Sequence, residues 1–405
     1  MINRRTLKCI SCGTRITTRT GIGHAAVQKH KFSCPICKVE IGYVLDVGQA
    51  ELSLKYREPT NAKWDDAGGD SEHMLLFYPE VMIPKDLGGF MSPFVVTVGN
   101  HTDIVAYQKA EAIRRNFKDN QWPVLQRLYV HFENESLDLL RNESQSLAGK
   151  VPDLDDEEKR GSWVVGMTRY FFDFFIADPQ RSSQIEKSIA LAYRKHEAEL
   201  RGLASKYVKT GRMSALWKEL KSVRRQFMTL YESLLPLLMV RRYWRDDKQD
   251  IGEYKLSVKN FEDLKGLYID SVETSFRLVV IGLAVELIAT TGKPVITTKA
   301  GGNKNIWWFE QMNNGIKDGQ LSKFPVFGPI TAVLDLGLRN GVGHNSAHYD
   351  ANSDQIVYVK GDDINLNEVR LAYTVFVDKV FAAYCAFELL TVYFQWFFVA
   401  GGGRL

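Results

Sequence analysis

Two C-x2-C pairs near the N-terminus constrain the fold of this chain more than any other feature. The first pair is Cys9 and Cys12, and the second, after twenty-one intervening residues, is Cys34 and Cys37. Each pair supplies two thiolates from one tight turn, and four thiolates surround a zinc ion as a tetrahedron. Gly13 permits the positive φ that such a turn often requires. The spacing therefore predicts a structural zinc site, similar to a zinc ribbon, in residues 1–50.

A zinc ion with four cysteine ligands has no open position for a substrate, so we expect no catalysis at the metal. His24 and His30 are possible alternate ligands, although the four cysteines already fill the shell. A disulfide framework is the competing interpretation of the cysteines. No positively charged start followed by an apolar run precedes a small-residue cleavage site, so nothing indicates secretion. Cysteine pairs in a reducing compartment favour metal binding, and we expect the protein to be cytoplasmic.

The hydrophobic pattern predicts a mainly α fold with four parts. These are a zinc ribbon in residues 1–50, a linker with a small irregular or β segment in 51–100, a helical region in 101–211, and a C-terminal helical bundle with a small β insertion in 212–405. The insertion contains a strand at Gln355–Lys360. Asp363 or Asn365 then caps a final helix that runs to about Ala400.

The segment Val380–Ala400 is nearly all apolar and long enough to cross a bilayer. Glu388 lies close to its middle, where a carboxylate is costly in lipid. We therefore interpret this segment as a helix buried in a bundle or at a dimer interface, and we expect no membrane association. Cys385, within the same segment, is interpreted as a core residue.

Basic side chains are concentrated in two stretches, although the net charge is only +4. Residues 1–50 carry eight Lys and Arg against two acidic residues, and residues 161–225 carry 13 against 6. Such stretches are typical of proteins that handle a polyanion such as RNA. They are equally typical of solvated helix faces, so both interpretations stay open.

The second motif is an arginine followed five residues later by a histidine, Arg339-Asn340-Gly-Val-Gly-His344. A histidine can move a proton and a guanidinium can neutralise charge on a phosphorane, so the two suffice for RNA cleavage without a metal. The alternative is a helix C-terminus, where cations are favoured and glycines end the last turn. On an ideal helix a separation of five residues places side chains about 140° apart, which favours a site completed by a second subunit.

The pattern R-N-x3-H, followed by Asn345–Asp350 and the predicted strand, resembles the HEPN superfamily of ribonucleases. The resemblance implies that the domain in residues 212–405 dimerises, so that two motifs form one cleft. It further implies that His344 is the general acid/base for attack by the ribose 2′-OH, that Arg339 holds the phosphate and that Asn340 orients it. The products would be a 2′,3′-cyclic phosphate and a 5′-hydroxyl. One HEPN subgroup has a tyrosine two residues after the histidine, where this chain has Ser346.

Two acidic residues of the apolar 267–291 segment bear on the motif. Glu273 and Glu286 either pair with Arg339 from across the bundle or occupy exposed or cap-like positions. Both interpretations fit the sequence.

These features together predict a homodimeric, metal-independent endoribonuclease that acts on RNA and contains structural zinc. HEPN ribonucleases include growth-arresting toxins and anti-phage abortive-infection effectors, so the resemblance also implies a phage-derived or host protein as the trigger. The alternative is a non-catalytic adaptor that binds nucleic acid or protein through the zinc ribbon and the basic helices.

Overall fold

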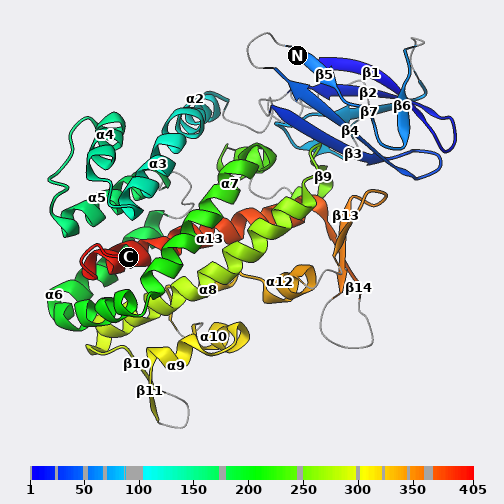
Figure 1. The fold of residues 1–405 in the computed structure, drawn as a ribbon. Coiled ribbons are helices and arrows are strands. Elements are labelled where there is room, and N and C mark those ends of the chain that lie inside the picture. Colours follow the sequence, from blue (N-terminus) through cyan, green and yellow to red (C-terminus); the bar gives the residue numbers. More distant parts are fainter. Residues whose placement is uncertain are drawn as a thin grey trace. The chain divides into compact units, whose positions relative to one another are not determined.

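The computed structural model describes residues 2–22, 26–48, 53–66, 71–85, 87, 104–172, 179–243, 250–297, 302–321, 324–343, 347–359 and 368–405 (Figure 1). Contacts divide the chain into two units, each built from separate stretches of sequence. The first unit comprises Met1–Glu111, Thr229–Gly266 and Asn340–Phe381, and the second comprises Ala112–Met228, Leu267–Arg339 and Ala382–Leu405.

Two sheets form the N-terminal part of the first unit, which we call the β region (residues 2–85). The first sheet has the order β6-β1-β2-β7 and consists of β6 (Ala62–Trp64), β1 (Ile2–Cys9), β2 (Arg15–Gly21) and β7 (His73–Phe77). The second has the order β3-β4-β5 and consists of β3 (Val27–Ser33), β4 (Glu40–Val47) and β5 (Leu54–Tyr56). β1–β2 and β3–β4 are antiparallel hairpins, whereas β2 and β7 pair in parallel.

One apolar core takes side chains from both of these sheets. Strand β3 alternates exposed and buried positions, so that Gln28, His30 and Phe32 point to the interior. This period of two is what a strand with one buried face requires. The core cluster consists of Leu7, Cys9, Ile16, Phe32, Cys34, Ile41, Tyr43, Ala62 and Phe77. Because Cys9 and Cys34 belong to this cluster, the cysteine pairs are anchored in the core of the β region.

Strands β5, β6 and β7 lie in the segment expected to contain a linker and a small irregular or β segment. They pair with β4, β1 and β2 respectively, so these three strands extend the same sheets as the cysteine-bearing strands. The sequence hides this because β5 and β6 have only three residues each. Three residues are too few for an alternating pattern to be recognised.

Two further small sheets belong to the first unit. β8 (Ile83–Pro84) pairs with β9 (Tyr254–Lys255), and β12 (His348–Asp350), β13 (Gln355–Val359) and β14 (Glu368–Ala372) form an antiparallel sheet. The predicted β insertion and its strand are thereby confirmed. The predicted start of the final helix is wrong, because α13 begins at Tyr373. The preceding residues form β14, whose pairing with β13 determines their conformation, and Asp363 and Asn365 lie outside the described residues.

Helices dominate the described chain from residue 104 onward, as the pattern predicted. They are α2 (Ile104–Asn116), a π-helical turn (Phe117–Gln121), α3 (Trp122–Glu133), α4 (Leu137–Ala148), α5 (Glu157–Phe172), α6 (Pro179–Lys209), α7 (Arg212–Tyr243), a 3-10 turn (Ile251–Glu253), α8 (Phe261–Thr291), α9 (Ile306–Glu310), α10 (Asn314–Leu321), α11 (Gly328–Thr331), α12 (Leu336–Gly343) and α13 (Tyr373–Ala400). A small hairpin, β10 (Val295–Thr297) with β11 (Asn303–Asn305), precedes α9. Because the described residues of the β region form strands and turns but no helix, the expectation of a mainly α fold holds in part.

The part of the apolar helix α13 from Ala382 onward packs inside the second unit. Its Glu388 is completely buried and binds the buried Arg224 of α7 through two bonds, Nε to Oε1 at 2.9 Å and Nη2 to Oε2 at 2.7 Å. The Tyr384 hydroxyl donates to the same carboxylate at 2.7 Å. Trp217 of α7 stacks on Phe394 and Phe398 of α13. The prediction of a helix buried in a bundle is confirmed, and no helix among the described residues combines the length and apolar character needed to cross a bilayer.

Candidate metal centre and candidate active site

The four cysteines lie in the turns of two hairpins that share one backbone geometry. In the β1–β2 turn, the Gly13 N–H donates to the Cys9 carbonyl at 3.0 Å, and Gly13 has a φ of +75°. In the β3–β4 turn, the Lys38 N–H donates to the Cys34 carbonyl at 3.0 Å, and Lys38 has a φ of +63°. The residue after each second cysteine therefore adopts the left-handed conformation. Glycine adopts it without strain, so the sequence indicated the positive φ of the first turn, whereas the positive φ at Lys38 was not expected.

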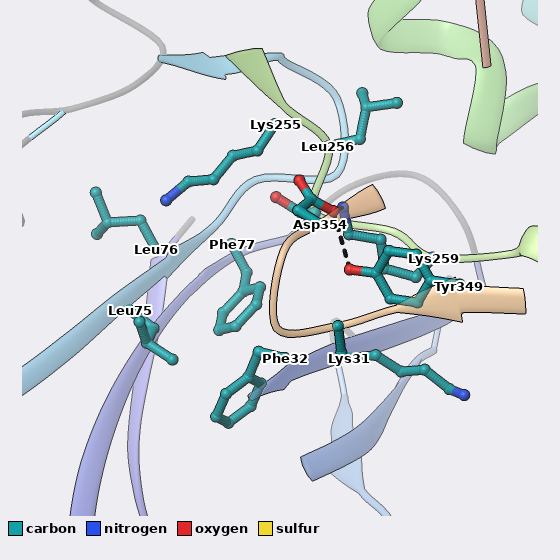
Figure 2. Close-up of a pocket in the computed structure, with 12 residues that line it drawn as sticks. Lys31, Phe32, Leu75, Leu76, Phe77, Lys255, Leu256, Lys259, Tyr349 and Asp354 are labelled. Atoms are coloured by element: carbon teal, nitrogen blue, oxygen red, sulfur yellow. Dashed lines mark hydrogen bonds and ion pairs between the residues drawn. The ribbon is translucent and has the colours of Figure 1, made fainter. Parts of the chain in front are cut away.

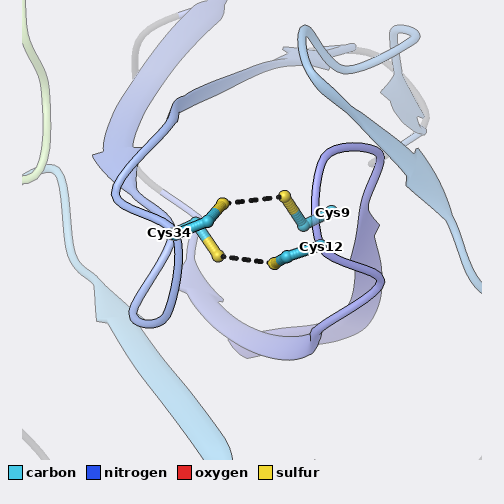
Figure 3. Close-up of side chains that lie close together, drawn as sticks. Cys9, Cys12 and Cys34 are labelled. Atoms are coloured by element: carbon cyan, nitrogen blue, oxygen red, sulfur yellow. Dashed lines mark hydrogen bonds between the residues drawn. The ribbon is translucent and has the colours of Figure 1, made fainter.

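These two turns bring the four sulfurs into one cluster (Figure 3). The Sγ atoms lie within 4.8 Å of one another, with Cys9 to Cys37 and Cys12 to Cys34 both at 3.6 Å. A tetrahedral ion with metal–sulfur bonds of about 2.3 Å separates its ligand sulfurs by about 3.8 Å. The cluster therefore fits a metal ion. Cys9 and Cys34 are buried and Cys12 and Cys37 are exposed, so one edge of the centre faces solvent.

Local hydrogen bonds set the protonation of the two exposed cysteines differently. The Thr14 hydroxyl, 3.1 Å from the Cys12 sulfur, and the Thr14 backbone lower the pKa of Cys12 to about 6. The Val39 backbone N–H favours the Cys37 thiolate, but desolvation and the neighbouring sulfurs outweigh it and raise the pKa of Cys37 to about 12. The thiolate is the form of a cysteine that binds a metal ion, so a lowered pKa at Cys12 favours metal binding.

His30 does not contribute to this centre. Its ring is buried between Tyr43 and Phe77, with ring centroids 4.8 and 5.2 Å away. Burial lowers the pKa of His30 to about 4, so the imidazole is neutral at pH 7. His24, the other alternate ligand, lies outside the described residues.

The arginine motif begins in the short helix α12. The Asp335 carboxylate accepts a hydrogen bond from the Leu338 N–H at 2.9 Å and so caps the start of this helix. The Tyr268 hydroxyl of α8 donates to the Asp335 carbonyl at 3.0 Å. Arg339 Nε lies 2.6 Å from Glu273 Oε1 of α8, with the two side chains 28% and 30% exposed. Of the two interpretations of Glu273, the structure thus shows the pairing with Arg339.

Glu286, the other proposed partner, is engaged elsewhere. The Tyr393 hydroxyl of α13 donates a hydrogen bond to its carboxylate, and burial raises the pKa of Glu286. Glu286 is thus part of the helix packing rather than of the arginine motif.

The residues directly after Arg339 differ in their exposure to solvent. Asn340 is exposed, whereas Gly341 is buried. A Cβ at Gly341 would overlap the ring of Tyr358 on β13, so this glycine allows a close approach and does not end the helix, which continues to Gly343. His344 lies outside the described residues.

A cavity of about 300 Å³ in the second unit is lined by Glu273, the partner of Arg339. The lining also contains two ion pairs. They join Arg212 to Glu310 at 3.2 Å and Arg277 to Glu219. Lys317 also lines the cavity, and burial lowers its pKa. The sequence did not indicate this charged cavity, because its lining combines side chains of five different helices, α6 to α10.

Comparison of the chain with protein-family models, curated proteins and solved structures gave no match. The interpretation of both sites therefore depends on their chemistry.

Proposed function

We propose that this protein is a metal-independent endoribonuclease in which Arg339, Asn340 and His344 act on one phosphodiester of RNA. The observation that carries the proposal is the fixed position of Arg339. Glu273 holds the guanidinium in the middle of α12, next in sequence to the exposed Asn340, and the same carboxylate lines a charged cavity. A pre-positioned cation beside a polar cavity is what stabilisation of a developing phosphorane requires.

The reaction needs no nucleophile from the protein. His344 takes the proton of the ribose 2′-OH, the 2′-oxygen attacks the phosphorus, and the bond from phosphorus to the 5′-oxygen breaks. The leaving oxygen receives a proton, which gives a 2′,3′-cyclic phosphate and a 5′-hydroxyl. A histidine is suited to both transfers because its ordinary pKa lies near neutrality.

Arg339 binds the phosphate and neutralises its charge in this scheme, and Asn340 donates a hydrogen bond to it. An arginine carries five N–H donors, so an ion pair made through Nε is compatible with phosphate binding. The carboxylate of Glu273 keeps the guanidinium oriented in the absence of RNA.

The active form in this proposal is a homodimer in which two motifs share one cleft. Mixing Arg339→Ala protein with His344→Ala protein tests it, because a mixed dimer retains one arginine and one histidine in the cleft. Partial recovery of cleavage in the mixture is expected. A mixture as inactive as its parents, with subunit exchange verified, contradicts the shared cleft.

The cysteine cluster in this proposal holds a structural zinc ion through Cys9, Cys12, Cys34 and Cys37. The ion cross-links the two hairpin turns, and all four positions of its shell are filled by sulfur.

Cleavage of RNA by purified protein tests the activity. We expect wild-type protein to cut RNA in the presence of EDTA, and Arg339→Ala and His344→Ala to lose most of that activity. His348→Ala is the matched control, because His348 is an exposed histidine four residues further on. Equal cleavage by all proteins, or cleavage by none, contradicts the proposal.

A second candidate function, a protein-binding adaptor, is favoured by one observation. Ile10 and Ile36, one inside each C-x2-C turn, are 60% and 59% exposed. Two exposed isoleucines at the metal centre give an apolar contact for a partner. If this is the function, binding of the partner protein depends on Ile10 and Ile36 and is unaffected by His344→Ala.

A further inference from the structure

A second cavity, of about 150 Å³, lies in the first unit (Figure 2). Its lining comes from β3, β7, the segment around β9, and the turn between β12 and β13. None of the cysteines and none of the described residues of the arginine motif, Arg339 to Gly343, is among its lining residues. The cavity is therefore a separate feature of the molecule.

One part of the cavity is apolar and aromatic. The rings of Phe32 and Phe77 lie 5.5 Å apart, and Leu75 and Leu76 continue this surface. An apolar cavity of about 150 Å³ is large enough for a benzene ring. A phenyl group or a short branched chain thus matches the available space.

Another part of the lining is polar but has its charges balanced. Lys259 pairs with Asp354, and the Tyr349 hydroxyl donates to Asp354 Oδ1 at 2.9 Å (Figure 2). The Lys259 ammonium also lies 4.3 Å from the ring centroid of Tyr373. These contacts satisfy both ions. Lys31, at another position of the lining, pairs with Glu40 at 3.2 Å.

Lys255 supplies a second cation beside Asp354, whose carboxylate is already engaged by Lys259 and Tyr349. It is half-buried, and within the described part of the chain no hydrogen bond or ion pair involves its ammonium. Burial lowers the pKa of Lys255. Only the electrostatic attraction of Asp354 offsets the charge of this partly desolvated ammonium, and an anion bound beside it adds a partner of its own.

We propose that this cavity binds a carboxylate carried on a small apolar body, with the apolar body against Phe32 and Phe77 and the carboxylate accepting hydrogen bonds from Lys255. A single surplus cation matches a single negative charge, whereas a phosphate monoester carries up to two. The ligand is either a free organic acid or the C-terminal residue of a peptide, because both present this chemistry. The inference is independent of the proposed ribonuclease activity.

Isothermal titration calorimetry of the full-length protein tests this binding with phenylacetate and with its neutral counterpart 2-phenylethanol. We expect phenylacetate to bind and the alcohol to bind at least about tenfold more weakly, because a charged hydrogen bond is lost. A short peptide ending in a free phenylalanine carboxylate, compared with its C-terminal amide, distinguishes the two sources. If the free peptide binds more tightly than phenylacetate, the ligand is a C-terminus, and if only phenylacetate binds, it is a free acid.

Two variants separate the charge from the space. Lys255→Met keeps the length of the side chain and removes the charge, and should weaken phenylacetate binding by about tenfold or more. Ala351→Leu narrows the cavity and should weaken binding while the charge remains. Lys29→Met is the matched control, because Lys29 is an exposed lysine of β3 outside the lining. Failure of wild-type protein to bind phenylacetate, or equal affinity of Lys255→Met and wild type, overturns the proposal.

Discussion

The β region and the helical second unit both bring sulfur or charged groups together, but the groups that meet are separated by different distances in the sequence. In the β region, four sulfurs converge from two hairpin turns that lie within thirty residues of one another. In the second unit, Arg224 and Glu388 are 164 residues apart, and Glu273 and Arg339 come from two different helices. The positions of the sulfurs are determined by two local turns. The positions of the paired arginines and glutamates depend on how whole helices pack.

Loss of the proposed zinc ion should have the largest effect on stability, and the effect should be confined to the β region. Cys34→Ser replaces a buried ligand, and structural zinc centres contribute on the order of 10 kcal/mol to folding. We expect wild-type protein to contain one zinc ion per chain and the variant to lose it together with the β structure. Elemental analysis and circular dichroism measure both.

Cys385→Ser is the control for this experiment, since Cys385 lies in α13 and is not one of the four clustered cysteines. A Cys34→Ser protein that keeps a full complement of zinc contradicts the assignment of the ligands.

Loss of one partner of the buried ion pair should have the next largest effect. Arg224→Met leaves the Glu388 carboxylate buried without its cation, and we expect the free energy of unfolding to fall by about 3–5 kcal/mol. The double variant Arg224→Met/Glu388→Leu removes both charges and should recover most of this loss. Urea denaturation measures the difference. A double variant as unstable as the single one shows that packing, rather than charge, dominates at this position.

His30 should make the stability of the β region depend on pH. Its pKa is about 4 in the folded protein, below the ordinary 6.5, because the ring is buried. The unfolded chain therefore binds a proton first as the pH falls below 6.5, and stability decreases between pH 6.5 and 4 by roughly 3 kcal/mol.

Comparison of wild type with His30→Phe isolates this contribution, because other groups titrate equally in both. The unfolding free energy of the variant should depend less steeply on pH over this interval. His73→Gln is the control, since His73 is only half-buried. Parallel pH profiles for wild type and His30→Phe contradict the buried neutral imidazole.

The Arg339–Glu273 pair should have the smallest effect on stability. Both side chains are partly exposed, so Arg339→Gln should change the unfolding free energy by less than about 1 kcal/mol. The same variant should lose RNA cleavage. A loss of stability as large as that of Arg224→Met would show that Arg339 is a structural residue like Arg224. That result would favour the adaptor function over RNA cleavage.

The sequence predicted those features that depend on short-range patterns. The four cysteines, the helices beyond residue 104 and the strand at 355–359 follow from spacing and periodicity. The pairing of Glu273 with Arg339 was one of two interpretations, and only the packing of α8 against α12 distinguishes them.

Long-range contacts account for what the sequence did not predict. Strand β14 exists because it pairs with β13, and Lys38 adopts a positive φ because its turn closes the second cysteine pair. The two cavities combine side chains from distant segments, so no local pattern reveals them.

The chemistry of the RNA ends produced by the purified protein tests the central claim most directly. Full-length protein with verified zinc content is incubated with RNA in EDTA, and the 3′ ends of the fragments are identified by mass spectrometry. The account predicts 2′,3′-cyclic phosphates from wild type, none from His344→Ala, and no cleavage of DNA of the same sequence. Fragments with 3′-hydroxyl ends, or cyclic phosphates formed equally by His344→Ala, would contradict it.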